Sequence, residues 1–127
     1  MQDGFYKSHA ITADIAGFLL AAFADPSNGD RVALMTGPGQ PVAGVTDSVG
    51  GTAAHGLVDL QLTQVADLRF GGVVAAGDPI TADAFGRGVK AVKPAAGSVV
   101  WCIGTARGPG LADDIGKVLI SPFAIYG

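Results

Sequence analysis

One thiol and two imidazoles are the chain's candidates for nucleophilic chemistry: Cys102, His9 and His55. An imidazole beside a thiol can take its proton and leave a thiolate that attacks a carbonyl. Cys102, however, lies between Trp101 and Ile103 in an apolar run that predicts a strand, where a buried, unreactive thiol is expected. A lone cysteine also excludes an internal disulfide and a multi-thiol zinc site. We therefore predict no catalytic cysteine.

Aspartates are the second group that could do chemistry. Asp113 and Asp114 are adjacent, and Asp78 lies close to Asp83 in the sequence. Such carboxylates could bind a hard cation, or act as acid and base on a glycosidic bond. Each pair offers too few ligands for a dedicated metal site, and Asp beside Gly or Pro ordinarily shapes a turn. We expect these aspartates to be structural, and we predict no metal, no cofactor and no enzymatic activity.

Two glycine-rich segments, residues 37–39 and 104–110, could surround a phosphate with backbone N–H groups. Neither leads into a helix with a suitably placed lysine, so turns are expected there. The chain also lacks the Gly-x-Ser-x-Gly, Walker and His-Glu-x-x-His motifs. Standard hydrolase and nucleotide-binding mechanisms are therefore not predicted.

The composition restricts the class of protein further. With 127 residues, 49% of them hydrophobic and 15% charged, the chain can build one domain with a substantial core. The net charge is −3 and the eight Lys and Arg residues are scattered, so we predict no nucleic-acid binding. The longest apolar stretch, residues 15–24, is too short for a membrane-spanning helix, and we predict no membrane insertion. No basic and apolar leader follows Met1, so we expect synthesis in the cytoplasm.

Frequent turn residues indicate a fold made of short strands. The chain has 20 Gly and 7 Pro, and all 11 acidic residues are Asp rather than the helix-favouring Glu. Residues 58–63 alternate between apolar and polar side chains, as expected of a strand with one buried face. Other apolar, often β-branched runs are residues 31–35, 41–45, 73–74, 98–103 and 116–120. We predict an all-β single domain, a compact barrel or sandwich with short strands and at most one or two short helices.

Three segments are compatible with a helix as well as with other structures. Residues 12–24 suit a strand or a helix equally, because Thr12 could cap a helix that Gly17 would interrupt. Residues 63–70 could also be helical, and residues 112–115 could form a short helical turn. The pattern alone leaves these segments open.

An internal similarity appears when the chain is compared with itself at an offset of 60 positions. The matched residues are Gly44 with Gly104, Gly50 with Gly110, Gly56 with Gly116, Val58 with Val118, and Leu60 with Ile120. Chance matches are common in a chain this rich in glycine. If the similarity is structural, it predicts two strand–loop–strand units within one barrel or sandwich.

A longer signature occupies residues 71–89, with the sequence Gly-Gly-Val-Val-Ala-Ala-Gly-Asp-Pro-Ile-Thr-Ala-Asp-Ala-Phe-Gly-Arg-Gly-Val. It resembles the central signature of tailed-phage head decoration proteins, also called capsid cement proteins. Their pattern there is Gly, small or apolar residues, Gly-Asp-Pro and a hydrophobic residue, then Thr-or-Ser-x-Asp-x-x-Gly-Arg. The resemblance covers residues 12–121, with flanking matches at residues 14–17, 42–45, 54–58, 103–106 and 116–120. The apolar residues 18–23 depart from the more polar alternation usual at that place.

The resemblance implies a β-barrel-like structural protein on the outer surface of a phage head. Such proteins are commonly homotrimers that bridge neighbouring major capsid subunits. The expected partners are therefore the major capsid protein and further copies of this chain, and the expected location is the virion, after synthesis in the host cytoplasm. The resemblance also favours a strand over residues 17–24.

Apolar residues near both ends are the candidates for such contacts. We expect residues 1–12 to form an N-terminal arm ahead of a single β domain, residues 13–127, because the arm precedes the first expected regular element. The predicted capsid or subunit contacts are Phe5, Tyr6, Phe123, Ile125 and Tyr126. These side chains could instead close the monomer's own barrel.

Two other functions stay open: a small β-barrel module that binds a glycan or small molecule, and an enzyme with an Asp-based site.

Overall fold

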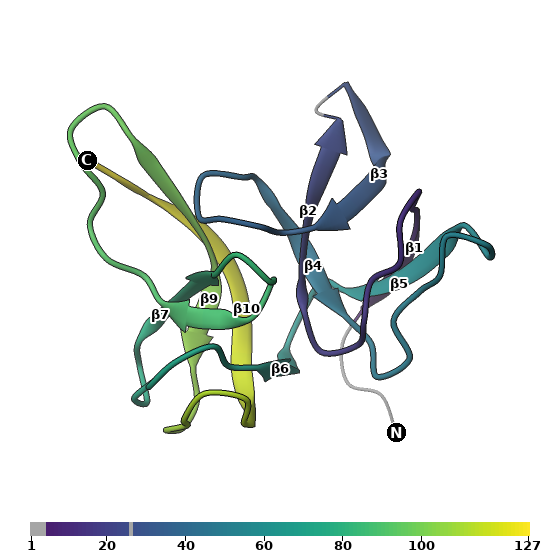
Figure 1. The fold of residues 1–127 in the computed structure, drawn as a ribbon. Coiled ribbons are helices and arrows are strands. Elements are labelled where there is room, and N and C mark those ends of the chain that lie inside the picture. The colour runs from purple at the N-terminus through teal and green to yellow at the C-terminus, as the bar shows by residue number, and fades with distance from the viewer. Residues whose placement is uncertain (1–4, 26) are drawn as a thin grey trace.

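All regular elements in the described part of the chain, residues 5–25 and 27–127, are β-strands in this computed structural model. The first sheet contains β1 (Tyr6–Ala10), β2 (Leu20–Asp25), β3 (Asn28–Leu34), β4 (Val42–Thr46) and β5 (Leu57–Gln61). The second contains β6 (Val65–Arg69), β7 (Pro79–Ala82), β8 (Gly88–Lys90), β9 (Val99–Ala106) and β10 (Ile115–Tyr126). The predicted all-β fold is confirmed, and Figure 1 shows the two sheets side by side.

The first sheet closes into a small barrel, called the first barrel below. Its strands pair in the order β1-β3-β2-β4-β5, and β1 also pairs antiparallel with β5. The seam between β1 and β3 is short, because its parallel register consists of the single pair Ala10 and Arg31. Buried apolar side chains fill the barrel: Ile11, Ile15, Ala21, Val32, Val58 and Leu60.

Part of the expected N-terminal arm is a strand of this barrel, which corrects the prediction for residues 6–10. Tyr6 lies opposite Gln61, and its hydroxyl donates a hydrogen bond of 2.8 Å to Gln61 Oε1. The sequence concealed the strand because residues 7–9 are all polar and show no apolar alternation. Residues 1–4, also assigned to the arm, lie outside the described residues.

The second sheet repeats the topology of the first. Its strand order is β6-β10-β9-β7-β8, and the corresponding strands of the first sheet follow one another as β1-β5-β4-β2-β3 around the barrel. An isolated parallel bridge between Phe70 and Gly88 stands where Ala10 and Arg31 close the first barrel. The chain therefore consists of two similar five-stranded halves, β1–β5 and β6–β10.

Corresponding residue pairs establish the repeat. Ile15–Gly51 matches Val74–Gly110, and Ala21–Gly44 matches Ile80–Gly104. Following the pairs from strand to strand makes further positions equivalent: Gln61 and Leu119, Tyr6 and Val65, His9 and Leu68, Phe18 and Gly77. The predicted internal similarity is thus structural, but each unit has five strands. Of the predicted matches, Gly44 with Gly104 is confirmed. The others were wrong in register: Gly110 corresponds to Gly51 rather than Gly50, Gly116 to Val58 rather than Gly56, and Val118 to Leu60 rather than Val58.

Strand β2 lies between two cores, which explains the ambiguous sequence of residues 12–24. Ala21 belongs to the core of the first barrel, whereas Leu20 and Ala22 belong to a core shared with the second sheet. A strand buried on both faces shows a continuous apolar run rather than alternation. The strand favoured by the resemblance is therefore present, and residues 63–70, which could have been helical, contain β6.

The two halves are joined by this shared core and by backbone hydrogen bonds. The first half contributes Leu20, Ala22, Met35, Val42 and Val45, and the second contributes more side chains, which include Leu68, Phe70, Ile80, Ile103, Val118 and Ile120. Leu20 N donates to Gly86 O and Arg69 N donates to Phe18 O, both at 2.8 Å. The two sheets thus pack as a single domain.

Candidate functional site

The most specific part of the sequence signature forms the turn between β7 and β8. Asp83 Oδ1 accepts hydrogen bonds from Phe85 N at 2.8 Å and from Arg87 N at 2.9 Å. Gly86 has a φ of 75°, in the left-handed region that glycine adopts without steric cost. Turn geometry therefore accounts for the Asp-x-x-Gly-Arg pattern.

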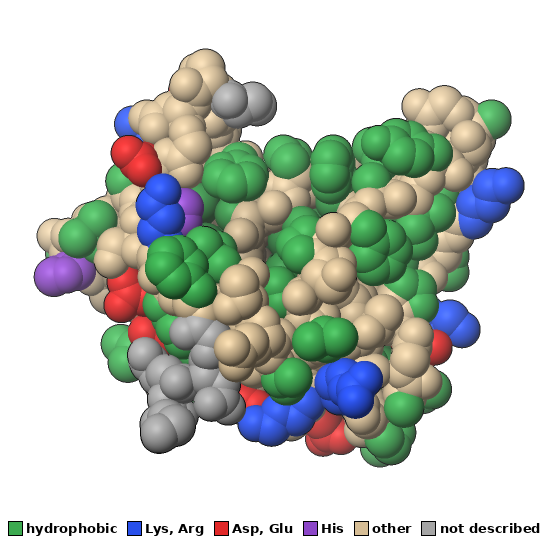
Figure 2. All heavy atoms as spheres, turned by 180° about the vertical axis from the view of Figure 1, so that it is seen from behind, with side chains coloured by type: hydrophobic (Ala, Val, Ile, Leu, Met, Phe, Trp, Pro, Cys, Tyr) green, Lys and Arg blue, Asp and Glu red, His purple; other side chains and the backbone are tan. Residues whose placement is uncertain are grey.

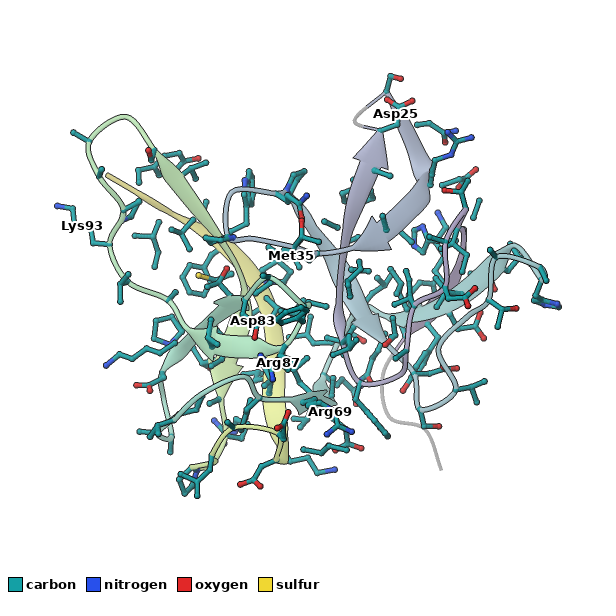
Figure 3. All side chains as sticks on the ribbon, viewed as in Figure 1. Asp25, Met35, Arg69, Asp83, Arg87 and Lys93 are labelled. Atoms are coloured by element: carbon teal, nitrogen blue, oxygen red, sulfur yellow. The ribbon has the colours of Figure 1, made fainter. Side chains whose placement is uncertain are left out.

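Arg87 extends this network at the surface. Its Nε donates to Asp83 Oδ2 at 2.8 Å, and its Nη1 pairs with Asp113 Oδ1 at 3.2 Å. The hydrogen bond to Asp83 is the main reason that the pKa of Arg87 lies above its ordinary value. The guanidinium also lies over the ring of Phe85, 5.2 Å from its centroid. Figure 3 shows Asp83 and Arg87 close together on the second sheet, with Arg69 below them.

The same turn contacts the first half of the molecule. Gly86 O accepts the hydrogen bond from Leu20 N, and a side chain at position 86 would collide with Leu34. A glycine is therefore needed here both for the turn and for the close approach of the two halves. The signature residues thus position the junction between the halves.

A surface hollow of 460 Å³ lies at this junction. Residues of both halves line it: Ala16, Gly17, Phe18, Leu19, Ser48, Arg69, Phe85 and Arg87. Aromatic and guanidinium groups are the side chains that contribute most to protein contacts. Arg87 is already paired with two aspartates, whereas Arg69 Nη1 donates to the carbonyl of Asp113 at 3.1 Å. Sequence reasoning missed the hollow, because no local pattern places Phe18 beside Arg69.

Two predicted contact residues, Phe5 just before β1 and Tyr6 at its start, differ in exposure. Phe5 is 60% exposed, and its backbone is bonded on both sides, with its N–H donating to Thr63 Oγ1 and its C=O accepting from Leu62 N. Tyr6 is half-buried, and its hydroxyl is bonded to Gln61. The ring of Phe5 is thus available to a partner, whereas Tyr6 contributes to the pairing of β1 with β5.

The predicted contact residues at the other end lie on the terminal part of β10. This part pairs with β9, while β6 pairs with β10 only as far as Leu119. Tyr126 is 71% exposed and Phe123 is 37% exposed. Ile125 packs instead on a small cluster of the same chain, Ala91, Val100 and Cys102. Phe123 and Tyr126 therefore face outward, whereas Ile125 stabilises the second sheet.

The structure does not bring these two sets of residues together. Strand β1 and the end of β10 lie at opposite sides of the molecule (Figure 1). On the face seen in Figure 2, hydrophobic side chains cover much of the middle, and most charged side chains lie toward the edges. The chain therefore presents two separate candidate contact surfaces, one at Phe5 and one around the end of β10, where Phe123 and Tyr126 project from opposite faces of the strand.

The other candidates for chemistry occupy structural positions. Cys102 is buried in β9, and burial raises the pKa of its thiol, as expected of an unreactive cysteine. Asp78 Oδ2 accepts from Ala75 N, and Asp114 Oδ2 accepts from Leu111 N, both at 2.9 Å. The prediction that these aspartates shape turns is confirmed.

Neither a cluster of metal ligands nor a membrane-spanning helix occurs in the described part of the chain. Among residues 5–25 and 27–127, no three His, Cys, Asp or Glu side chains are grouped so that they could hold a metal ion. In the same part of the chain, no helix has the length and apolar character to cross a membrane.

Comparisons with known proteins add a likeness of fold. No family model and no curated protein matches the sequence. Among solved structures, the chain is similar to the N base of head fiber gp8.5 of bacteriophage phi29, with a TM-score of 0.66 and 13% sequence identity. The likeness covers 92% of this chain and 93% of that one, so both five-stranded halves take part in it. At this identity it establishes that the two proteins share a fold.

Proposed function

We propose that this chain is a structural, non-enzymatic protein of a phage virion. It binds the outer surface of the head, bridges neighbouring major capsid subunits and assembles as a homotrimer. The observation that carries the proposal is the fold, which the chain shares over 92% of its length with the base of a phage head fiber. The signature of residues 71–89 supports it separately, because that resemblance to head decoration proteins was found in the sequence alone.

The two contact surfaces suit the two kinds of contact that this function needs. A protein that joins copies of itself and also binds a capsid uses different surfaces for the two partners. Phe5, beside β1, is the contact with the capsid in this proposal. Phe123 and Tyr126, on the part of β10 that extends beyond β6, are the contact between subunits.

A clamp of this kind stabilises the shell without chemistry. Binding to the expanded shell alone favours that state by mass action. Several modest contacts on one trimer also add strength, because the first contact raises the effective concentration of the others. Exposed apolar side chains on a compact β domain are sufficient for this role.

The first experiment combines light scattering with co-sedimentation. The mass of the purified protein is measured in solution, and the protein is then incubated with expanded, empty heads of the phage that encodes it. We expect a trimer that sediments with the heads. A monomer that stays in the supernatant would overturn the proposal.

Matched variants separate the two contact surfaces. Phe123→Ala combined with Tyr126→Ala is expected to shift the measured mass from trimer toward monomer. Phe5→Ala is expected to keep the mass and to lower the amount bound to heads. Val49→Ala is the control, because Val49 is an 83% exposed apolar side chain outside both surfaces. If all three variants have the same mass in solution and bind heads equally, Phe5, Phe123 and Tyr126 are not the contact residues.

The hollow at the junction favours one alternative, a small module that binds a glycan or another small molecule. Phe18 and Phe85 offer apolar faces there, and Arg69 offers a cation. Calorimetric titration with neutral and carboxylate-bearing oligosaccharides tests this function. Saturable binding of an oligosaccharide by a monomeric protein that does not sediment with phage heads would favour the binding module over the virion protein.

A further inference from the structure

The hollow at the junction of the two halves contains side chains that the repeated unit does not need. Phe18 and Arg69 occupy positions where the other half has Gly77 and Ala10. Because the counterparts are small, neither the ring nor the guanidinium is required by the shared topology. Phe85 lies in the β7–β8 turn, whereas the corresponding β2–β3 turn contains no aromatic residue. All three side chains line the same hollow, which indicates a role in binding rather than in folding.

Phe18 occupies its position at a conformational cost. Its φ is 62°, in the left-handed region that a bulky side chain rarely adopts. Such strain persists where surrounding contacts enforce it, and it is concentrated at functional sites. The backbone is held on both sides, because Phe18 N donates to Asp47 O at 3.3 Å and Phe18 O accepts from Arg69 N at 2.8 Å. The second of these bonds brings the backbone of Arg69 next to that of Phe18.

Arg69 has a charge that no carboxylate neutralises within residues 5–25 and 27–127. Its Nη1 donates to the main-chain carbonyl of Asp113 at 3.1 Å, and none of the ion pairs includes it. Arg87, the other arginine of the hollow, pairs with Asp83 and Asp113. A guanidinium has further N–H donors, in a planar fork that fits a carboxylate. Arg69 is thus the group of the hollow that can bind an anionic partner.

The lining of the hollow complements a carboxylate that lies beside an apolar group. Its described residues include two arginines and no acidic residue, although the chain has a net charge of −3. Phe18, Leu19 and Phe85 supply the apolar part. Apolar surface with a few placed polar groups is typical of binding sites, and aromatic and arginine side chains contribute most to protein contacts. The lining therefore fits a protein segment with an acidic and an apolar side chain.

We propose that the hollow binds an acidic segment of the major capsid protein, in which a carboxylate pairs with Arg69 and a neighbouring apolar side chain packs on Phe18 and Phe85. The inference rests on the proposed function, because it names the capsid as the source of the segment. It adds a charged contact to the apolar ones at Phe5 and at the end of β10. A charged contact fixes the orientation of the bound partner, whereas apolar contacts are non-directional.

A glycan fits this lining less well than a protein segment. A saccharide carries many hydroxyl groups, and each of them loses water on binding and needs a new partner. Among the described residues of the lining, Ser48 is the one polar side chain besides the two arginines. One face of the Phe85 ring is also covered by the Arg87 guanidinium, 5.2 Å from the ring centroid. An acidic glycan is therefore the competing outcome of the test.

The proposal is tested by loading expanded, empty heads of the phage that encodes this chain, at increasing protein concentration. Arg69→Gln removes the charge but keeps a donor for the Asp113 carbonyl. We expect it to raise the concentration that gives half-saturation about tenfold. Arg107→Gln is the matched control, because Arg107 is exposed, lies outside the lining and carries the same charge. The control is expected to load as the unaltered chain does.

A second variant removes the ring. Phe18→Gly relieves the left-handed strain, and we expect it to load less than the unaltered chain while its urea denaturation curve changes little. If the unaltered chain loads, and Arg69→Gln, Phe18→Gly and Arg107→Gln all reach half-saturation at the same concentration as it does, this proposal is overturned and the proposed function stands. If the unaltered chain does not load, the proposed function fails and the capsid site fails with it.

Calorimetric titration with a carboxylate-bearing oligosaccharide distinguishes a glycan from the capsid segment. We expect no saturable binding to the unaltered chain. Saturable binding that is lost in Arg69→Gln, while that variant loads heads as the unaltered chain does, would assign the hollow to an acidic glycan and overturn the proposal.

Discussion

The two halves of the molecule share one topology but differ in regularity. The second half has Leu68 inside and Gly77, with a φ of 87°, at its left-handed position. The first half has His9 and Phe18 at the equivalent positions, and Phe18 keeps a φ of 62°. Residues that break local conformational or packing preferences are expected where the sequence serves function rather than stability. At these two positions the first half departs from the local rules that the second half follows, although the second half has a left-handed residue of its own other than glycine, Asp113 with a φ of 70°.

The largest expected effect concerns the glycine that both halves share on the strand equivalent to β4. A Cβ at Gly104 would overlap the carbonyl oxygen of Leu119, whereas a Cβ at Gly44 would lie 2.8 Å from that of Gln61. We expect Gly104→Ala to lower the free energy of unfolding by more than about 3 kcal/mol, and Gly44→Ala by about 2 kcal/mol. Urea denaturation measures both. A larger loss for Gly44→Ala would contradict the closer packing of the second half.

The next prediction exchanges the residues at the equivalent interior positions of the two halves, His9 and Leu68. Leu68→His places an unpaired imidazole in a fully buried site, and we expect it to lower the free energy of unfolding by about 3 kcal/mol. His9→Leu removes an imidazole whose two buried ring nitrogens have no hydrogen-bond partner among the described residues, and we expect a gain of about 1 kcal/mol. Both are measured by urea denaturation. A loss of stability in His9→Leu would mean that the barrel needs the imidazole.

The sequence predicted the class of fold and the presence of a repeat, because both depend on local patterns. Turn residues and β-branched runs indicate strands wherever they occur, and Gly44 and Gly104 mark equivalent places in both halves. Strand β1 was missed because residues 7–9 are polar, and β2 was ambiguous because both of its faces are buried. The short strands β7 and β8 lay inside the signature and were not recognised as strands.

The candidate site was predicted less completely than the fold. Phe5 and Tyr126 are exposed, as a contact residue must be, but Tyr6 and Ile125 pack within their own sheets. An apolar residue near a chain end looks the same in both situations, because its exposure depends on strand pairing across the chain. The hollow beside Phe18 depends on the docking of one half on the other, which no sequence pattern records.

A third prediction compares the hairpins of the two halves. Asp83 accepts from two backbone N–H groups and from Arg87 Nε, and its side chain is largely buried. We expect Asp83→Ala to lower the free energy of unfolding by about 2 kcal/mol, because the turn loses its acceptor. Asp25→Ala is the matched control at the exposed β2–β3 turn, where the aspartate bonds only to the nearby Ser27, and a smaller loss is expected. Thermal unfolding measures both variants. Equal losses of unfolding free energy would show that the β7–β8 turn contributes no more stability than the β2–β3 turn.

The smallest effect concerns the left-handed positions. A Cβ at Gly77 meets nothing within 4 Å, so Gly77→Ala tests backbone strain alone and should cost about 1 kcal/mol. Phe18 already carries this strain at the rim of the hollow, so Phe18→Gly relieves it while removing a ring that is only partly buried. We therefore expect Phe18→Gly to change the free energy of unfolding by less than about 1 kcal/mol in urea denaturation. A larger loss of unfolding free energy would show that the Phe18 ring stabilises the fold by packing. A small change would show that stability does not explain why an aromatic residue occupies this strained position. The ring would then be explained by contact with a ligand or partner at the hollow.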